Sequence, residues 1–212
     1  MSGYTLWGRA GWGSAIVEAQ LEWYGLPYRF EALDDLFKSA DARARLEKVN
    51  PLAQVPTLVL PSGEVMSESA AITLLLADLT GQDSLVPGPM AKERGRFLRW
   101  LVFIVANIYP TFTYADDPSR FVSVNAARDP FRAATDAYAQ RLWRQLATEA
   151  GAPWFLGERM SALDLYLGVM TRWRPKRAWF EDNTPKLAAI AKQADALPRL
   201  AAIWARNMPT PG

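Results

Sequence analysis

The chain has 212 residues, half of them hydrophobic, and its 24 basic and 22 acidic residues give a formal net charge of +2. This length and composition are typical of a globular protein with one large domain or two small ones. The near-balanced charge argues against a nucleic-acid-binding surface. Cys and His are absent, which excludes disulfides, a thiolate nucleophile, His-assisted Ser or Cys catalysis and the usual zinc sites. Any chemistry must therefore use carboxylates, hydroxyls, Lys, backbone amides or a bound reagent.

The first 80 residues alternate between strand-like and helix-like segments. The residue pattern predicts strands at 4–7, 28–33, 57–60 and 64–66, and helices at 14–24, 39–49 and from 67 to about 79. Ser14 and Ser67 suit the N-cap position of their helices, and Gly25 suits the position just after the first helix ends. This order predicts a compact α/β unit.

The second half of the chain contains no strand-like alternation. Gly and Pro residues between 81 and 90 indicate a linker. Beyond it, amphipathic patterns predict helices at 91–109, with a kink at Pro110, and at 131–150, 161–173, 185–196 and 198–207. We therefore expect an α/β domain at 1–80, a linker at 81–90 and an all-helical domain at 91–212.

The sequence also bears on where the protein resides. No basic and apolar leader follows Met1, and the longest apolar stretch, 101–106, is too short to span a bilayer. We therefore expect a cytoplasmic protein without membrane contact.

Four short motifs point to a known family. They are Gly25-Leu26-Pro27-Tyr28, Asn50-Pro51-x-x-Gln54-Val55-Pro56, Glu68-Ser69-x-x-Ile72 and Phe155-Leu156-Gly157-x-x-x-Ser161-x-x-Asp164. In this order and spacing they resemble the glutathione S-transferase superfamily over essentially the whole chain. The resemblance implies a thioredoxin-like N-terminal domain followed by an all-helical C-terminal domain, glutathione as co-substrate, no metal, and a homodimer.

The resemblance assigns glutathione binding to Gln54, Val55, Pro56, Glu68 and Ser69. A cis peptide bond at Pro56 would expose the Val55 backbone for strand-like pairing with an extended tripeptide. Ser69, at a helix start, suits the γ-glutamyl carboxylate, and Glu68 the ammonium group. Ordinary structure offers alternatives: a trans Pro56 that begins a strand, a capped helix start at Ser67-Glu68-Ser69, and a solvated Gln54 amide.

The pair Ser161 and Asp164 has the spacing of a helix N-terminal capping box, with Met160 and Leu165 spaced to form a hydrophobic staple. We expect it to be structural and not catalytic.

The catalytic position of the family falls in the Gly-rich segment 8–14. There a Tyr, Ser or Cys stabilises the thiolate of glutathione, whereas this sequence has Gly11 and Gly13 at the matching Ser and Cys positions. Ser14 is the only hydroxyl in the turn, so we expect it to be catalytic, unless it serves only as an N-cap. Alternatively, the backbone N–H groups of Trp12, Gly13 and Ser14 surround the sulfur.

Family members hold the second substrate between the two domains. Aromatic and polar residues predict this pocket, although each is also a candidate for plain core packing: Arg9, Trp12, Asn107, Tyr109, Phe112, Tyr114 and Trp173.

The leading hypothesis is a glutathione transferase that adds the glutathione thiolate to a small apolar electrophile. Two alternatives stay open. One is another glutathione-dependent enzyme, such as an isomerase, dehalogenase or ether-cleaving enzyme. The other is a non-catalytic glutathione-binding protein, which the glycines at the catalytic position favour.

Overall fold

A computed structural model describes residues 3–208 of the chain. Two compact units divide it: the first contains the residues up to Val86 together with those from Gln193 onward, and the second runs from Pro87 to Lys192. The sequence analysis assigned everything after residue 90 to the helical domain. The difference arises because the last helix, α10 (Ala201–Asn207), packs against α1 (Ser14–Tyr24) of the first unit.

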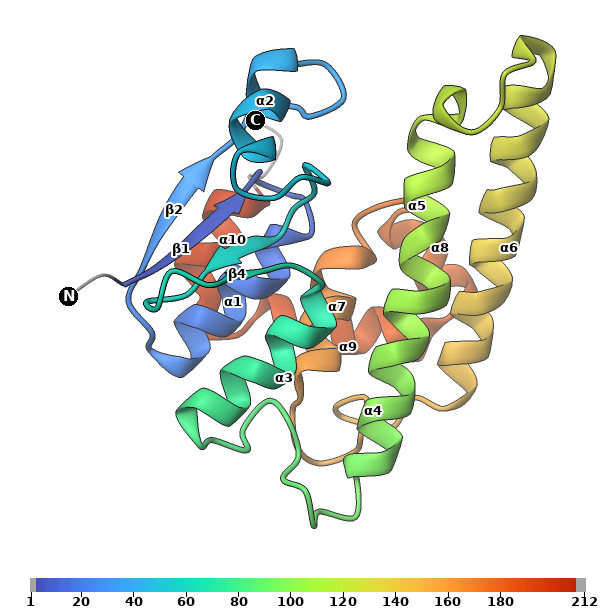
Figure 1. The fold of residues 1–212 in the computed structure, drawn as a ribbon. Coiled ribbons are helices and arrows are strands. Elements are labelled where there is room, and N and C mark those ends of the chain that lie inside the picture. The colour runs from blue at the N-terminus through green and yellow to red at the C-terminus, as the bar shows by residue number, and fades with distance from the viewer. Residues whose placement is uncertain (1–2, 209–212) are drawn as a thin grey trace. The chain divides into compact units, whose positions relative to one another are not determined.

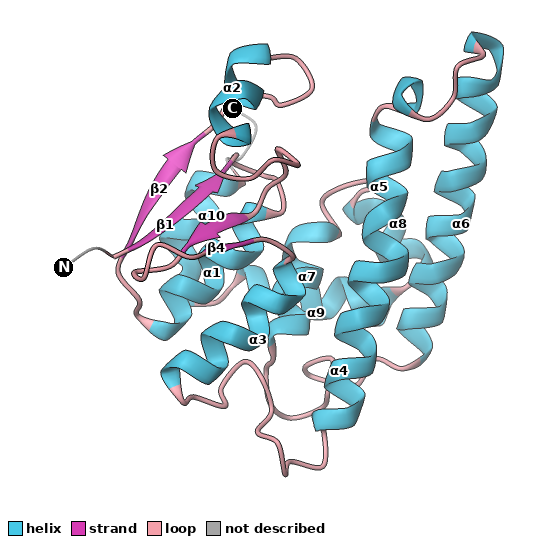
Figure 2. Cartoon of the chain, in the orientation of Figure 1, coloured by secondary structure: helices cyan, strands magenta, loops and turns pink. Residues whose placement is uncertain are grey.

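A four-stranded sheet of order β2-β1-β3-β4 forms the centre of the first unit. Its strands are β1 (Tyr4–Gly8), β2 (Tyr28–Ala32), β3 (Thr57–Val59) and β4 (Val65–Met66). β1 runs parallel to β2 and antiparallel to β3, and β3 is antiparallel to β4. Figure 2 shows in magenta the strands that give the first unit its α/β character, as predicted.

Helices cover both faces of this sheet because side chains alternate along β1. Leu6 is fully buried, and the Cα of Gly8 faces Ser14 of α1. α3 (Ser69–Thr80) packs beside α1. Trp7 points the other way, toward an apolar cluster that includes Leu46 of α2 (Ala40–Glu47).

The helix ends of the first unit correct two predictions. Gly25 ends α1 in the left-handed conformation, as predicted. Ser14 is not an N-cap: Gly13 takes that position and Ser14 is the first helical residue. α3 begins at Ser69, with Glu68 and not Ser67 in the capping position. In neither case does a side chain at the N-cap accept a helix N–H, so the first N–H groups that have no backbone acceptor stay available to other groups.

The second unit is helical throughout its regular structure, as predicted. Figure 1 traces its helices in green to orange. They are α4 (Arg94–Phe103), a π-helical turn (Ile104–Ile108), α5 (Tyr109–Asp116), short 3₁₀ turns at Pro118–Arg120 and Asn125–Ala127, α6 (Arg128–Thr148), α7 (Ala162–Met170), α8 (Arg177–Asn183) and α9 (Pro185–Asp195), whose last residues lie in the first unit. None of the helices in residues 3–208 has both the length and the apolar character needed to cross a membrane.

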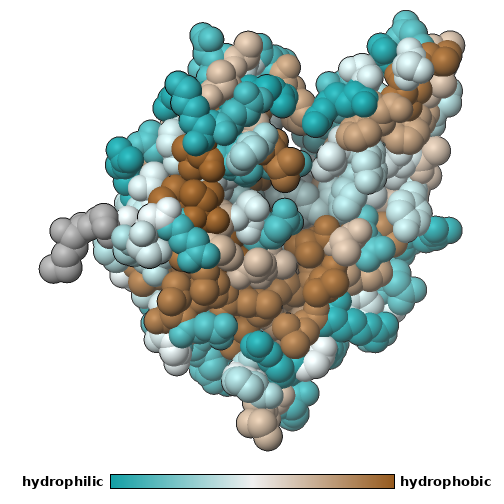
Figure 3. Space-filling view, viewed as in Figure 1, coloured by the Kyte–Doolittle hydropathy of each residue, from teal (hydrophilic) through white to brown (hydrophobic). Residues whose placement is uncertain are grey.

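Proline explains the break predicted between α4 and α5. Pro110 has no N–H to donate to the preceding turn, and the chain widens into the π-helical turn directly before it. α5 and α6 then pack together as a hairpin. On the face drawn in Figure 3, apolar surface reaches the far end of this hairpin, where Phe121 and Val124 are exposed.

α7 forms the core of the second unit. Every residue of α7 is buried. The predicted capping box is confirmed: Asp164 Oδ2 accepts from the N–H of Ser161 at 2.7 Å, and its Oδ1 accepts from the N–H of Phe155, also at 2.7 Å. Burial raises the pKa of Asp164 to about 6, against the opposing effect of these donors. The motif therefore ties the preceding loop to the helix, and its role is structural.

Candidate functional site

The strand register brings three of the predicted segments to one edge of the sheet. Thr57, the first residue of β3, pairs with Trp7 near the end of β1, and Leu58 pairs with Met66 at the end of β4. The loop after β1, the segment before β3 and the segment after β4 therefore lie together. Figure 1 shows this edge where the arrowhead of β1 ends.

The segment before β3 presents a free backbone edge. The Val55–Pro56 peptide bond is cis, as predicted. Within residues 3–208 the N–H and C=O of Val55 have no hydrogen-bond partner. The carbonyl of Gln54, by contrast, accepts from the side chains of Asn50 and Thr57, which fixes the turn. An extended peptide can pair with Val55 by the hydrogen bonds of an added strand.

The segment after β4 turns sharply into α3. Glu68 is exposed and has a φ of 63°, an uncommon conformation for a residue with a side chain. Ser69 is only 8% exposed and begins the helix. The first N–H groups of α3 lack acceptors within the helix, and they stand at its positive end. Glu68 and Ser69 thus combine an acceptor for an ammonium group with donors for a carboxylate.

Trp12 connects the loop after β1 to the segment before β3. Its ring packs on the same apolar cluster as Val55, and it lies 5.4 Å from the ring of Phe37. The guanidinium of Arg9 lies 5.5 Å from the Trp12 ring and 3.8 Å from the carboxylate of Asp35. Arg9 and Trp12 therefore lie at the same edge as the Val55 segment.

The hydroxyl of Ser14, which was predicted to be catalytic, is engaged within the loop. Its side chain is fully buried, and its hydroxyl donates to the C=O of Arg9 at 3.0 Å and accepts from the N–H of Arg9 at 3.1 Å. Gly8 is packed so closely that a Cβ there would lie 2.4 Å from Ser14. The hydroxyl is thus enclosed and occupied, and it closes the loop onto the helix. The sequence did not predict this burial, because Ser14 directly follows a Gly-rich turn.

Backbone amides remain as candidate donors to a sulfur. The N–H of Trp12 donates to the C=O of Arg9 at 3.1 Å and so is already used. The N–H groups of Gly13 and Ser14 donate to no acceptor among the described residues. Both residues are buried. Gly13 is the N-cap of α1 and so stands at the positive end of that helix.

The pocket residues predicted in the second unit separate into three groups. Tyr109, Phe112 and Trp173 form an aromatic cluster, in which the Trp173 ring lies 5.4 Å from Tyr109 and 5.0 Å from Phe112. Asn107 lies in the π-helical turn and its side chain donates to the C=O of Phe103 at 3.3 Å. Tyr114 is exposed and contacts the ring of Phe121 at 5.0 Å. Only the first group therefore forms a continuous apolar wall.

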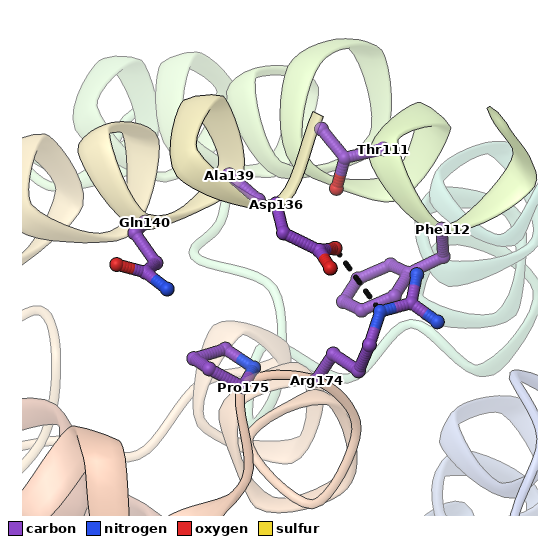
Figure 4. A pocket seen from close by; sticks show the side chains of 7 residues that line it. All are labelled: Thr111, Phe112, Asp136, Ala139, Gln140, Arg174 and Pro175. Atoms are coloured by element: carbon purple, nitrogen blue, oxygen red, sulfur yellow. Dashed lines mark hydrogen bonds and ion pairs between the residues drawn. The ribbon is translucent and has the colours of Figure 1, made fainter. Parts of the chain in front are cut away.

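A small cavity of about 220 Å³ lies beside this wall within the second unit. Figure 4 shows the residues that line it: Thr111, Phe112, Asp136, Ala139, Gln140, Arg174 and Pro175. Arg174 bridges Asp116 at 2.5 Å and Asp136 at 3.0 Å, and so joins α5 to α6. The paired charges show that this cavity is braced by an ion-pair network.

Comparisons with known proteins agree with these observations. The family model "Glutathione S-transferase, N-terminal domain" matches residues 14–79. A GST-like protein of Escherichia coli K12, YncG, is 37% identical over 203 residues, which are 95% of this chain and 97% of that protein. The chain belongs to the glutathione S-transferase superfamily.

Solved structures of this superfamily share the fold. A glutathione transferase homologue from Sulfitobacter, crystallised with bound glutathione, superimposes with a TM-score of 0.82 at 20% identity and covers 98% of this chain and 100% of its own. A glutathione transferase from Methylococcus capsulatus reaches 0.76 at 28% identity over 94% and 96% of the two chains. The predicted superfamily, its thioredoxin-like first domain and its helical second domain are thereby confirmed, and the predicted enzyme class is that of these homologues.

The structure also brings out two residues that sequence reasoning missed. Glu18 of α1 is fully buried, and its carboxylate accepts from Tyr28, Arg206 and Asn207. Asn207 in turn accepts from the N–H of Gly11, at 3.4 Å. A Glu among the apolar residues of 15–21 was the available signal for Glu18. Nothing local marked Asn207, because Gly11 and Glu18, the two partners that link it to α1 and the loop before it, lie more than 180 positions away.

Proposed function

We propose that this chain is a glutathione transferase that binds glutathione along the edge formed by Gln54, Val55, Pro56, Glu68 and Ser69. The cysteinyl backbone of glutathione pairs with the N–H and C=O of Val55. The γ-glutamyl carboxylate accepts from Ser69 and from the first amides of α3. Glu68 accepts from the ammonium group, and Gln54 contributes its exposed side-chain amide. The free polar groups and the helix end at this edge support the assignment.

The thiolate of bound glutathione is stabilised by the N–H of Gly13 and the positive end of α1, with the Arg9 charge close by. A free thiol has a pKa of about 8.5, and a helix N-terminus lowers this value. Backbone donors replace the missing hydroxyl, since Ser14 is already hydrogen-bonded at both its donor and its acceptor.

The thiolate then attacks an apolar electrophile. In substitution, a sulfur–carbon bond forms while the bond to the leaving group breaks, and the leaving group takes the electron pair. In an addition reaction, the sulfur–carbon bond forms and the adjacent carbon of the electrophile takes a proton. We assign the electrophile to the predicted pocket residues, of which Tyr109, Phe112 and Trp173 form an aromatic cluster in the second unit.

The free Val55 edge beside the α3 N-terminus carries the proposal, and glutathione itself tests it. The protein is expected to be retained on immobilised glutathione, and bound glutathione is expected to show thiolate absorbance at a lower pH than free glutathione. Glu68→Ala should weaken retention without changing the thermal unfolding midpoint, because Glu68 is exposed. Glu64→Ala, an exposed Glu of the preceding turn, is the matched control. Equal retention of Glu68→Ala and Glu64→Ala would contradict the binding assignment.

One observation favours a second function, a non-catalytic glutathione-binding protein. The loop that faces the expected sulfur position offers no free side-chain hydroxyl, because its only one, on Ser14, is enclosed. Glutathione that binds with an unshifted thiol pKa would exclude the transferase and leave this binding protein. An isomerase, dehalogenase or ether-cleaving enzyme would instead show the shifted pKa, and product analysis would distinguish them from conjugation.

The assembly and location of the protein extend the proposal. We propose a homodimer in the cytoplasm, by analogy with the family. A monomer mass in sedimentation would contradict the dimer. Recovery of the protein in a fraction other than the cytoplasm would contradict the location.

A further inference from the structure

We infer that Asn207, held in place by the buried carboxylate of Glu18, positions the glycine loop that faces the glutathione sulfur. This inference rests on the proposed function for its chemical meaning. It makes the end of α10 part of the thiol-activating apparatus, although that helix lies almost at the other end of the chain.

Both the nitrogen and the oxygen of the Asn207 side-chain amide are hydrogen-bonded. Its Nδ2 donates to Glu18 Oε2 at 2.5 Å and to the C=O of Ile203 at 3.0 Å, and its Oδ1 accepts from the N–H of Gly11. Asn207 is only 3% exposed, and Glu18 is fully buried. Because a carboxylate accepts and cannot donate, Glu18 must face the NH₂ group of Asn207. The Oδ1 atom is thereby directed at the loop.

The loop itself depends on this contact. Gly11 adopts a φ of +78°, and a Cβ at Gly11 would lie 3.3 Å from the backbone oxygen of Asn207. Three further hydrogen bonds, one between Arg9 and Trp12 and two between Arg9 and Ser14, close the loop from within. Asn207 holds it from outside. The direction of the Gly13 N–H is therefore set jointly by α1 and α10.

Glu18 has its own supports, which make it a rigid anchor. Arg206 donates to Oε1 and balances the charge, and the hydroxyl of Tyr28 donates to the same oxygen at 3.1 Å. Burial, together with the negative charge of Glu18, raises the pKa of Tyr28 to about 12, so Tyr28 stays a donor at neutral pH. α10 lies beside α1 in Figure 1, as this network requires.

A comparison of two α10 variants tests the inference. Asn207→Ala removes the bond to Gly11. Ile203→Ala removes a buried side chain of the same helix, 2% exposed, that makes no polar contact with the loop. The first readout is amide hydrogen exchange at Gly11 and Gly13 in the full-length protein. The second is the pKa of the thiol of bound glutathione, from its thiolate absorbance.

We expect Asn207→Ala to speed exchange in the loop at least tenfold and to raise the bound thiol pKa by about half a unit, which is about a threefold loss of thiolate at neutral pH. Ile203→Ala should move neither, even where it lowers overall stability. Glu18→Gln keeps an acceptor for Asn207 and should preserve the loop, whereas Glu18→Ala should behave like Asn207→Ala.

Loop exchange that is unchanged in Asn207→Ala, or equally faster in Ile203→Ala, overturns the inference and makes Asn207 a docking residue only. A faster loop with an unchanged thiol pKa overturns the link to thiol activation. An unshifted thiol pKa in the wild-type protein refutes the proposed transferase instead, and the exchange data still decide whether Asn207 positions the loop.

Discussion

Replacing Ser14 with Ala separates a structural hydroxyl from a catalytic one. In the structure the hydroxyl makes two hydrogen bonds, both with the backbone of Arg9. The substitution removes both bonds: it leaves the N–H of Arg9 without its partner, while the C=O of Arg9 keeps the N–H of Trp12. We therefore expect a change in stability and not in chemistry.

The magnitude follows from the burial of those groups. An unsatisfied buried polar group costs about 1–3 kcal/mol. Arg9 is only partly buried, so water replaces part of the lost bonding, and we expect about 1–2 kcal/mol. For a protein of this size, 1 kcal/mol lowers the unfolding midpoint by about 2–4 °C. Ser14→Ala should thus unfold about 2–8 °C below the wild type.

Thermal unfolding and steady-state turnover of the folded protein check this expectation together. Ser119→Ala, which removes an exposed hydroxyl bonded to Asp117, is the matched control and should shift stability by less than about 0.5 kcal/mol. Turnover of Ser14→Ala should fall less than about tenfold, whereas loss of a donor to a reacting group typically costs about 100-fold or more. Unchanged stability with a hundredfold loss of turnover would refute our interpretation and restore Ser14 as the catalytic residue.

Three other predictions concern separate parts of the molecule. Ser69→Ala should weaken glutathione binding about 10-fold or more in calorimetry, since it removes a hydrogen bond to a carboxylate, while Ser62→Ala in an exposed turn should not; equal affinities would count against the site. Asp164→Ala should cost about 2–5 kcal/mol in urea unfolding, because the buried N–H groups that it accepts from lose their partner, and a loss below about 1 kcal/mol would contradict the structural role. The raised pKa of Tyr28, to about 12, means that its contribution to stability is complete below pH 10 and is lost as the pH rises to 12; Tyr28→Phe should lack this alkaline loss, and identical pH profiles would refute the assignment.

Sequence reasoning located the elements of the first unit because local signals and tertiary packing agree there. Gly25 ended α1 where the left-handed conformation needs a glycine, and alternation in β1 marked its two faces. It failed at helix starts. A Ser before a helix is a common N-cap, yet the chain enters α1 through Gly13 and uses Ser14 for a longer-range contact. Cap chemistry gives a preference, and the approach of the preceding loop decides which residue takes the position.

The proposed binding edge and the glycine loop differed in predictability for the same reason. Val55, Pro56, Glu68 and Ser69 lie in short motifs whose geometry is set by neighbours in sequence. The position of the loop over α1 depends instead on Asn207, which no nearby residue predicts. The second unit repeats the pattern. The capping box of α7 was readable from two residues three positions apart, whereas α8 (Arg177–Asn183) is a short helix that the periodicity did not show.

The placement of α10 ties these points together. Its amphipathic pattern fits a helical domain, and the sequence analysis put it there. The structure pairs it with α1 because Glu18 is buried in the first unit and needs donors that no residue near it in sequence supplies except Tyr28. A buried carboxylate without partners is costly, so Arg206 and Asn207 are as necessary to α1 as α1 is to them. Under the proposed function, a transferase without a side-chain donor at the sulfur would depend more heavily on the direction of its backbone amides. The glycine loop of this chain gains that direction from a helix whose buried amide reaches it across the fold.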